Sequence, residues 1–168
     1  MPVPRSVVHA GGPRCPACLL PPRYCICGLL EPVETPVAIR VLIHAQERHK
    51  PSSSGALVGR AVPAAVLHTF SRVARHLPPI GLPPGSIPPD RDLLILHPGG
   101  EPLAPRDLAV PSCLLLLDGT WRQAGEMLRG VEALGRRVRL PDAAPRTSRF
   151  WLRRQHAPGF LSTAETQI

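Results

Sequence analysis

The sequence predicts an α/β domain with an open, mostly parallel sheet. Residues 93–97 and 113–117 are apolar runs without alternation of polar and apolar positions, which is typical of strands buried on both faces. From Trp121, apolar residues recur at spacings of three and four, which indicates an amphipathic helix directly after the second run. Strands that alternate with helices in this way favour a parallel sheet with helices on both faces.

Each element is predicted from its local pattern. The strands are residues 37–43, 93–97, 113–117 and 137–140. Residues 55–77 have a helical pattern, in which Pro63 either kinks the helix or opens its second part. The proline-rich residues 77–92 predict an extended surface loop, and residues 98–111 form a second break. The helix from Trp121 ends before Gly135, a typical helix stop.

The composition fits one domain of ordinary size with a polyanionic partner. The chain has 168 residues, of which 43% are hydrophobic, enough for a buried core. Lys and Arg number 20 against 12 Asp and Glu, which gives a formal charge of +8. This charge favours RNA or DNA as the partner, and a basic surface that serves solubility is the alternative.

The apolar runs are too short for a signal peptide or a membrane span, so the expected location is the cytoplasm, without a membrane partner. Thiols stay reduced there, so the cysteines are better explained as metal ligands or core residues than as disulfides. Four of them follow the pattern C-x2-C-x6-C-x-C: Cys15, Cys18, Cys25 and Cys27. We expect a closed, structural zinc site, with free thiols as the alternative. Cys113 opens an apolar strand and is expected in the core.

The segment LLLLDGTW, residues 114–121, is the strongest candidate for a catalytic centre. Asp118 follows a buried strand, so its carboxylate should emerge at the edge of the sheet where ligands of open α/β folds bind. Thr120 and Gln123 form a T-x-x-Q capping box that should start the helix at Trp121. The alternative is an ordinary strand-to-helix turn, in which Asp118 caps the helix and Trp121 packs on the core.

A second candidate binding segment follows the first strand. It contains His44, Glu47, Arg48 and Lys50 and leads to the Ser53-Ser54-Gly55 sequence at the start of the next helix. The backbone N–H groups of a helix start can hold a phosphate or a carboxylate. A metal at His44 and Glu47 is disfavoured because the two residues lack the helical spacing of zinc enzymes.

The last part of the chain combines cations, aromatic rings and a helix start. Arg149, Arg153 and Arg154 surround Phe150 and Trp151, a mixture suited to phosphates and stacked bases, although a solvated helix face explains it equally well. Residues 162–165 repeat the capping-box pattern with Ser162, Thr163 and Glu165.

Together these features resemble the DTW-domain family, the tRNA-uridine aminocarboxypropyltransferases. The resemblance rests on four elements in order: the cysteine cluster, the loop of residues 44–55, the D-x-T-W signature at residues 118–121, and the closing segment of residues 148–165. One short pattern would be weak, but four in the right order are specific. The expected organisation is a four-cysteine zinc-binding element in residues 1–35 and a DTW catalytic domain in residues 36–168.

The resemblance implies a SPOUT-like α/β fold with a knotted C-terminal region. It also implies transfer of the 3-amino-3-carboxypropyl group of S-adenosylmethionine to N3 of a tRNA uridine, with release of methylthioadenosine. The N3–H must lose its proton, so we predict Asp118 as the base; orienting the uracil or gripping the amino group of the co-substrate are its alternative roles.

The remaining assignments follow motif position and chemistry. Thr120 and Trp121 complete the catalytic set, with Trp121 stacked on a base or on adenine. The predicted co-substrate-binding residues are His44, Glu47, Ser53, Ser54, Gly55, Ser162, Thr163 and Glu165. The predicted tRNA-binding residues are Arg48, Lys50, Arg149, Arg153 and Arg154.

The chain departs from the family pattern at its C-terminal end. Related proteins continue into a helix, whereas three residues follow Glu165 here, so we expect a short and incomplete knotted region. Two alternatives stay open: a SPOUT-type RNA methyltransferase and, favoured by the short C-terminal end, a zinc-containing RNA-binding protein without activity.

Overall fold

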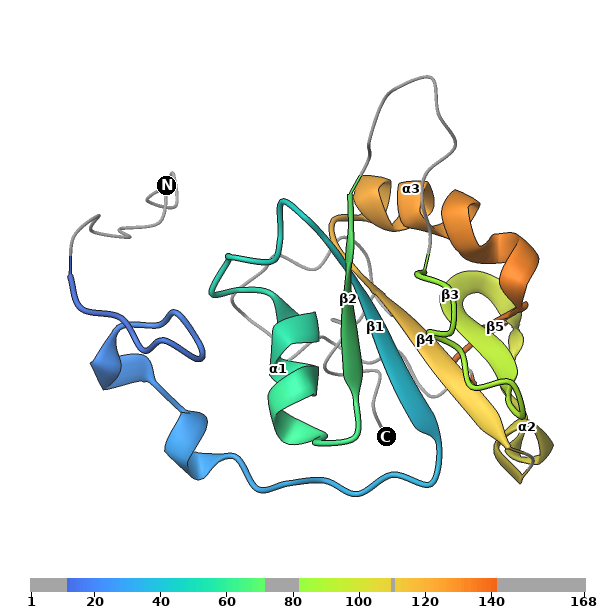
Figure 1. Ribbon diagram of the computed structural model, residues 1–168, viewed down its shortest axis with the longest axis horizontal. Helices are drawn as coiled ribbons and strands as arrows, with labels where there is room; N and C mark the ends of the chain where they lie inside the picture. Colours follow the sequence, from blue (N-terminus) through green and yellow to red (C-terminus); the bar gives the residue numbers. More distant parts are fainter. Residues whose placement is uncertain (1–11, 72–81, 110, 142–168) are drawn as a thin grey trace.

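A computed structural model describes residues 12–71, 82–109 and 111–141 of the chain (Figure 1). Five strands and three α-helices follow one another in this part. They are β1 (Ala38–His44), α1 (Ser54–Ala61), β2 (Val66–Phe70), β3 (Asp92–Pro102), α2 (Pro105–Ala109), β4 (Ser112–Asp118), α3 (Trp121–Val131) and β5 (Arg136–Arg139). Short 3-10 helices occur at Pro22–Tyr24, Cys27–Leu29 and Glu132–Leu134.

The strands form one sheet in the order β2-β1-β4-β3-β5, and every pairing in it is parallel. The predicted parallel α/β sheet is therefore confirmed. β1 and β4 lie next to each other at its centre, with Ile43 opposite Asp118. Their carboxyl ends consequently meet at one edge of the sheet.

Helices cover both faces of the sheet, as predicted (Figure 1). Successive side chains of a strand point to opposite faces. On β4, Leu115 therefore packs with Met127 of α3 in one core, whereas Leu116 packs with Val58 of α1 in the other. All four of these side chains are buried. This burial on both faces explains why the strand reads as an unbroken apolar run.

The predicted helix of residues 55–77 is wrong over residues 62–71, and residues 72–77 lie outside the described residues. α1 ends at Ala61, and β2 forms from Val66 to Phe70 along the edge of β1. Pro63 cannot continue the helix because it lacks the backbone N–H and its ring clashes with the preceding turn. The following sequence, VLHTF, is rich in the branched and aromatic residues that strands prefer.

Two other boundaries also differ from the prediction. β3 continues to Pro102 with an irregularity between Leu96 and Glu101, so the predicted break at residues 98–111 contains the end of a strand and the short helix α2. Of the predicted long loop, residues 82–91 are described and contain neither helix nor strand, as expected.

The cysteine-rich segment precedes the sheet and contacts α1. The Nη1 atom of Arg60 donates to the carbonyl of Ala17 at 3.0 Å, and the backbone N–H of Val33 donates to the carbonyl of Ala61 at 2.7 Å. The division into residues 1–35 and 36–168 stays a prediction. The predicted knotted C-terminal region is not among the described residues, which end at residue 141.

Candidate functional site

The candidate site lies at the carboxyl ends of β1 and β4. The chain leaves β1 through α1 on one face of the sheet and leaves β4 through α3 on the other face. Such a reversal between neighbouring parallel strands opens a crevice that binds ligands in open α/β folds. The segments that follow His44 and Asp118 lie on the two sides of this reversal point.

Asp118 lies at this position, but its carboxylate is buried rather than open to solvent, with 2% of the residue exposed. The Ser53 hydroxyl donates to Oδ2 at 2.7 Å, and the Ser54 hydroxyl donates to Oδ1 at 3.2 Å. Ser53 is also the N-cap of α1, where its Oγ accepts a hydrogen bond from the N–H of Ala56 at 3.3 Å. The carboxylate thus connects the first turn of α1 to the end of β4.

Gly55 makes this close approach possible. A Cβ atom on Gly55 would lie 2.6 Å from the Cβ, 2.7 Å from the Cγ and 2.9 Å from the Oδ2 of Asp118. Contacts this short do not occur between unbonded carbons, so any side chain here would displace the carboxylate or the helix. The glycine therefore has a packing reason besides the predicted contact with the co-substrate.

The start of α3 has the predicted capping box. The N–H of Thr120 donates to the Gln123 side chain at 2.7 Å, and the N–H of Gln123 donates to Thr120 Oγ1 at 3.4 Å. Trp121 is the first residue of the helix and is 39% exposed. The indole is therefore only partly used in packing, and part of its surface is accessible for stacking on a ring.

The loop after β1 contacts the same helix start through a residue pair that the sequence reasoning missed. Gln123, which is 6% exposed, donates from Nε2 to the side-chain oxygen of Gln46 at 3.0 Å. The backbone N–H of Gln46 donates to Nδ1 of His44 at 3.3 Å. This contact places the proton of the neutral imidazole on Nε2. The His44 ring packs near Phe70, with 5.8 Å between the ring centroids.

Glu47 is fully buried in this loop, with 0% of the residue exposed. Its carboxylate accepts a hydrogen bond from Nζ of Lys50 at 2.7 Å, and the Lys50 side chain is 51% exposed. Arg48 donates from Nη1 to the hydroxyl of Thr69 at 3.0 Å. The buried Glu47 carboxylate thus stabilises the loop through its ion pair with Lys50. Arg48 and Lys50 are exposed at the surface of the loop.

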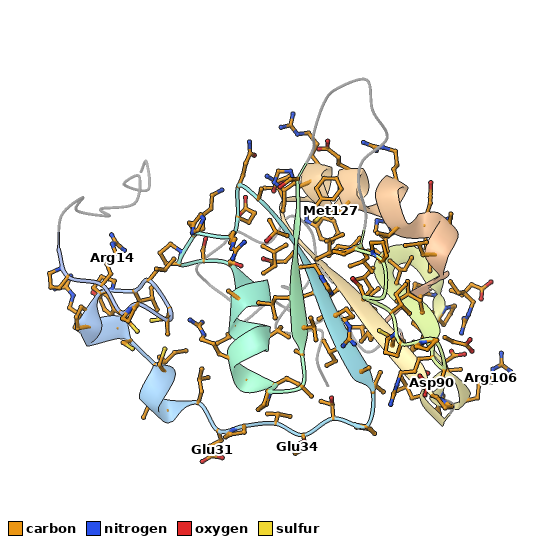
Figure 2. The ribbon with its side chains drawn as sticks, in the orientation of Figure 1. Arg14, Glu31, Glu34, Asp90, Arg106 and Met127 are labelled. Carbon is orange, nitrogen blue, oxygen red and sulfur yellow. The ribbon has the colours of Figure 1, made fainter. Side chains whose placement is uncertain are left out.

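Exposed charged side chains lie at both ends of the strands. Arg48, Lys50 and Arg122 are exposed around the carboxyl edge, where Asp118 and Glu47, the ion-pair partner of Lys50, are buried. Near the amino ends of the strands, the carboxylates of Glu31, Glu34 and Asp90 are exposed, and so is Arg106 (Figure 2). Cations are therefore exposed at both ends of the strands, including the end where Asp118 lies.

The four cysteines of the N-terminal segment come together in space. The sulfurs of Cys15, Cys18, Cys25 and Cys27 all lie within 4.8 Å of one another, and those of Cys15 and Cys27 are 3.8 Å apart. A tetrahedral ion with bonds of about 2.3 Å holds its sulfurs about 3.8 Å apart. The cluster can therefore hold a metal ion, and its donor set and spacing fit four-thiolate coordination.

Local groups affect the cysteine thiols in opposite directions. Backbone N–H groups of Cys18 and Ala17 lower the pKa of Cys15 to about 6, whereas burial and the neighbouring thiols raise the pKa of Cys27 to about 12. Four adjacent thiolates repel one another, and a bound cation compensates this repulsion. The backbone at Leu19, directly after Cys18, has φ of 60°.

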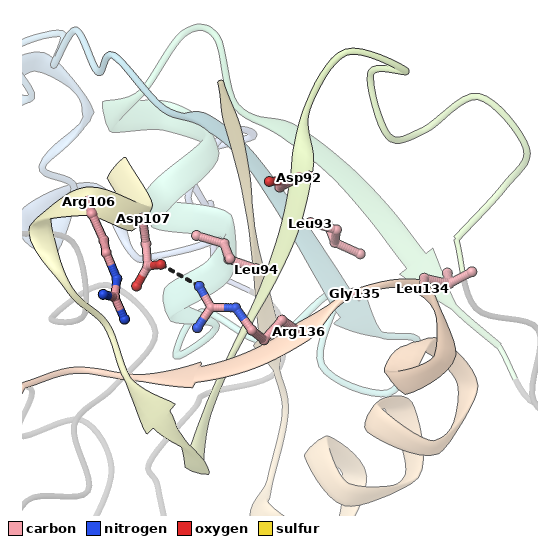
Figure 3. Close-up of a pocket in the computed structure, with 8 residues that line it drawn as sticks. All are labelled: Asp92, Leu93, Leu94, Arg106, Asp107, Leu134, Gly135 and Arg136. Atoms are coloured by element: carbon pink, nitrogen blue, oxygen red, sulfur yellow. Dashed lines mark hydrogen bonds and ion pairs between the residues drawn. The ribbon is translucent and has the colours of Figure 1, made fainter. Parts of the chain in front are cut away.

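A separate cavity of about 460 Å³ lies at the amino ends of β3 and β5 (Figure 3). Its lining residues are Asp92, Leu93, Leu94, Arg106, Asp107, Leu134, Gly135 and Arg136. Arg136 donates to Asp107 across it. A backbone hydrogen bond from Ala104 and the charge of Arg136 hold the pKa of Asp107 below its ordinary value. The cavity is at the opposite end of the strands from Asp118 and belongs to a different part of the surface.

The match to a known family covers nearly the whole chain. The family model of the DTW domain matches residues 12–168. The chain belongs to the DTW domain family. It matches no solved structure. Within the part of this DTW domain that the structure describes, no helix is long and apolar enough to cross a membrane.

The structure brings together a part of the predicted site of this DTW domain. Asp118, Ser53, Ser54 and Gly55 are in direct contact, and Thr120 and Trp121 begin the adjacent helix. His44 and Glu47 lie in the loop between these two helix starts. The remaining predicted residues, Arg149, Arg153, Arg154, Ser162, Thr163 and Glu165, lie outside the described residues, and their roles stay predictions.

Proposed function

We propose that this DTW domain transfers the 3-amino-3-carboxypropyl group from S-adenosylmethionine to N3 of a uridine in tRNA. The observation that carries the proposal is the DTW family match over residues 12–168. The position of the D-x-T-W signature supports it, because residues 118–121 connect β4 to α3 at the crevice. The exposed cations around this edge fit a tRNA backbone.

The reaction sets the requirements for the site. A new bond forms between uracil N3 and the methionine γ-carbon of S-adenosylmethionine, the bond from that carbon to the sulfonium sulfur breaks, and methylthioadenosine leaves with the electron pair. The N3 proton passes to a base. Since the sulfonium supplies its own leaving group, the protein must mainly align the two reactants and exclude competing attack by water.

The residues of the crevice fit these tasks. The exposed part of the Trp121 indole stacks on uracil or on adenine, and Arg48 and Lys50 contact tRNA phosphates. The hydroxyls of Ser53 and Ser54 already donate to Asp118, so they contribute to the co-substrate site through the shape of the turn. His44 lines the same loop and offers Nε2 as a polar contact.

We also propose that the ion in the cysteine cluster is zinc. Four thiolates at tetrahedral spacing are a common structural zinc site, and such a closed site has no position for a reactant. The metal would therefore maintain the fold of the N-terminal segment and would not take part in transfer. The contact from Arg60 to Ala17 connects that segment to α1.

Product analysis tests the proposed reaction. The purified protein is incubated with S-adenosylmethionine and unmodified tRNA, and the nucleoside products are separated by chromatography. We expect methylthioadenosine in amounts equal to the modified tRNA, and a large decrease for Trp121→Ala. S-adenosylhomocysteine in its place would show a methyltransferase. Neither product, with tRNA binding retained, would show an RNA-binding protein.

A further inference from the structure

We propose that Asp118 is a positioning residue, which fixes the first turn of α1 and the loop before it, and that it does not accept the uridine proton. This inference rests on the proposed function and specifies how the site of that function is assembled. It differs from the simplest interpretation of the signature, in which the acid at the end of the strand is the catalytic base.

The contacts of the carboxylate limit its access to a substrate. The oxygen of a general base must come within about 2.6–3.2 Å of the atom that bears the proton, or reach it through one water. Asp118 is 2% exposed, and each of its oxygens accepts a hydrogen bond from a serine hydroxyl of the α1 start. The side of the carboxylate that faces α1 is therefore occupied by the protein itself.

The packing of Gly55 closes the same space. The position in which a side chain of Gly55 would stand is filled by the Cβ, Cγ and Oδ2 atoms of Asp118. A substrate cannot enter between these two residues without separating α1 from β4. Gly55 and Asp118 thus pack directly against each other and leave no space for a ligand between them.

Electrostatics favours the same arrangement. The N-terminus of a helix has a partial positive charge, and hydroxyl donors bind a carboxylate strongly. The hydrogen bonds of Asp118 join residues that are 65 and 64 positions apart in the chain. They therefore determine where the start of α1 lies relative to the D-x-T-W turn, a distance that no local turn can set.

A series of turn hydrogen bonds extends this effect into the loop. Ser53 donates its N–H to Lys50 at 3.0 Å, Lys50 to Glu47 at 2.9 Å, and Glu47 to His44 at 2.7 Å. At the other side of the loop, Gln123 holds Gln46. The loop after β1 is therefore fixed between the starts of α1 and α3. Asp118 fixes its α1 end through the hydrogen bonds from Ser53 and Ser54.

The test separates positioning from proton transfer through Asp118→Asn. Asn has the same shape and can accept from one serine and donate to the other, but it cannot take a proton at neutral pH. We expect kcat within about fivefold of the unmodified protein and KM for S-adenosylmethionine raised about tenfold, which corresponds to one weakened hydrogen-bond contact. The pH profile of kcat should keep its shape.

A second variant disturbs the contact between Asp118 and α1 from the α1 side. Gly55→Ala retains the Asp118 carboxylate, but the added methyl group displaces it. This variant should therefore also raise the KM for S-adenosylmethionine with a small change in kcat. Gly125→Ala in α3 is the matched control, because nothing lies within 4 Å of the position of its Cβ, and it should leave both parameters unchanged. A kcat for Asp118→Asn that falls at least 100-fold at unchanged KM, with the rising limb of the pH profile lost, would overturn the proposal.

Amide hydrogen exchange gives a readout that does not require turnover. Asp118→Asn and Gly55→Ala should both speed exchange in residues 45–56, while exchange in β1 and β4 stays slow. Unchanged exchange in residues 45–56 would contradict positioning even if the protein is active. Conversely, a protein that forms no aminocarboxypropyl product but shows the faster exchange would contradict the proposed reaction and retain this inference.

Discussion

The sheet and the cysteine segment, residues 12–30, differ in what holds them together. The central strands have apolar side chains buried on both faces, in one core with α1 and another with α3. In residues 12–30 the buried residue is Cys18, whereas Tyr24 is 58% and Leu29 is 80% exposed. A segment this small cannot fold by burial alone. The hydrophobic effect therefore stabilises the sheet, whereas the cysteine segment depends on the metal ion that we propose for it.

The largest expected effect is the loss of this metal. Cys18→Ser should reduce bound zinc from one ion per chain to none and unfold residues 12–30, because binding of about 10–16 kcal/mol is coupled to the folding of such sites. The sheet should retain its slow hydrogen exchange. Metal content and residue-resolved exchange measure both effects.

Cys113→Ala is the matched control for that variant, since Cys113 is a buried core residue of β4. It should retain the zinc and lower the free energy of unfolding by about 1 kcal/mol. Loss of the sheet together with the zinc in Cys18→Ser would refute the distinction between the two regions.

The next effect concerns the core. Leu115→Ala should lower the free energy of unfolding by about 2–5 kcal/mol, because the side chain is fully buried against α3 and leaves a cavity. Leu29→Ala in the cysteine segment should change it by less than about 0.5 kcal/mol, since Leu29 is exposed. Equal effects of the two leucine substitutions in urea unfolding would contradict this difference between the regions.

A smaller effect is expected at Leu19, where φ is 60°. A non-glycine residue in this left-handed conformation costs about 1 kcal/mol or more. Leu19→Gly should therefore tighten zinc binding by up to about 1 kcal/mol. The larger conformational entropy of glycine in the unfolded chain offsets a part of this gain. Leu19→Val should weaken it, and competition with a chromogenic chelator measures both. Tighter binding by the valine variant would show that the conformation carries no strain.

The smallest effect is a pH dependence of the sheet. Burial, with the charge of Arg137, lowers the pKa of His97 below its ordinary 6.5. The unfolded chain then binds the proton more readily, so this contribution to stability is present above about pH 6.5 and decreases as the pH falls below it. In a Cys18→Ser background, His97→Gln should flatten the decline of stability between about pH 7 and pH 5. An unchanged slope would exclude His97 as its source.

Local patterns sufficed for much of the fold. Two features depend only on residues that are close in the sequence: the unbroken apolar run of β4 and the Thr120–Gln123 capping box. The structure has both. β2 could not be recognised in this way. Its residues became a strand because Pro63 ended α1 and because the edge of β1 offered hydrogen bonds.

The candidate site was predictable in its members but not in their contacts. The sequence placed Asp118 at the end of a strand and Ser53 at a helix start, and both positions are correct. Their hydrogen bond spans 65 residues, and the Gln46–Gln123 contact spans 77. The burial of the carboxylate follows from such long-range packing, which no local pattern contains.

The most direct test of the proposed function is mass spectrometry of tRNA nucleosides after incubation with S-adenosylmethionine. We predict a uridine that is heavier by one aminocarboxypropyl group, formed by the unmodified protein and strongly reduced with Trp121→Ala. A gain of one methyl group, or an unchanged nucleoside profile from protein that still binds tRNA, would contradict it.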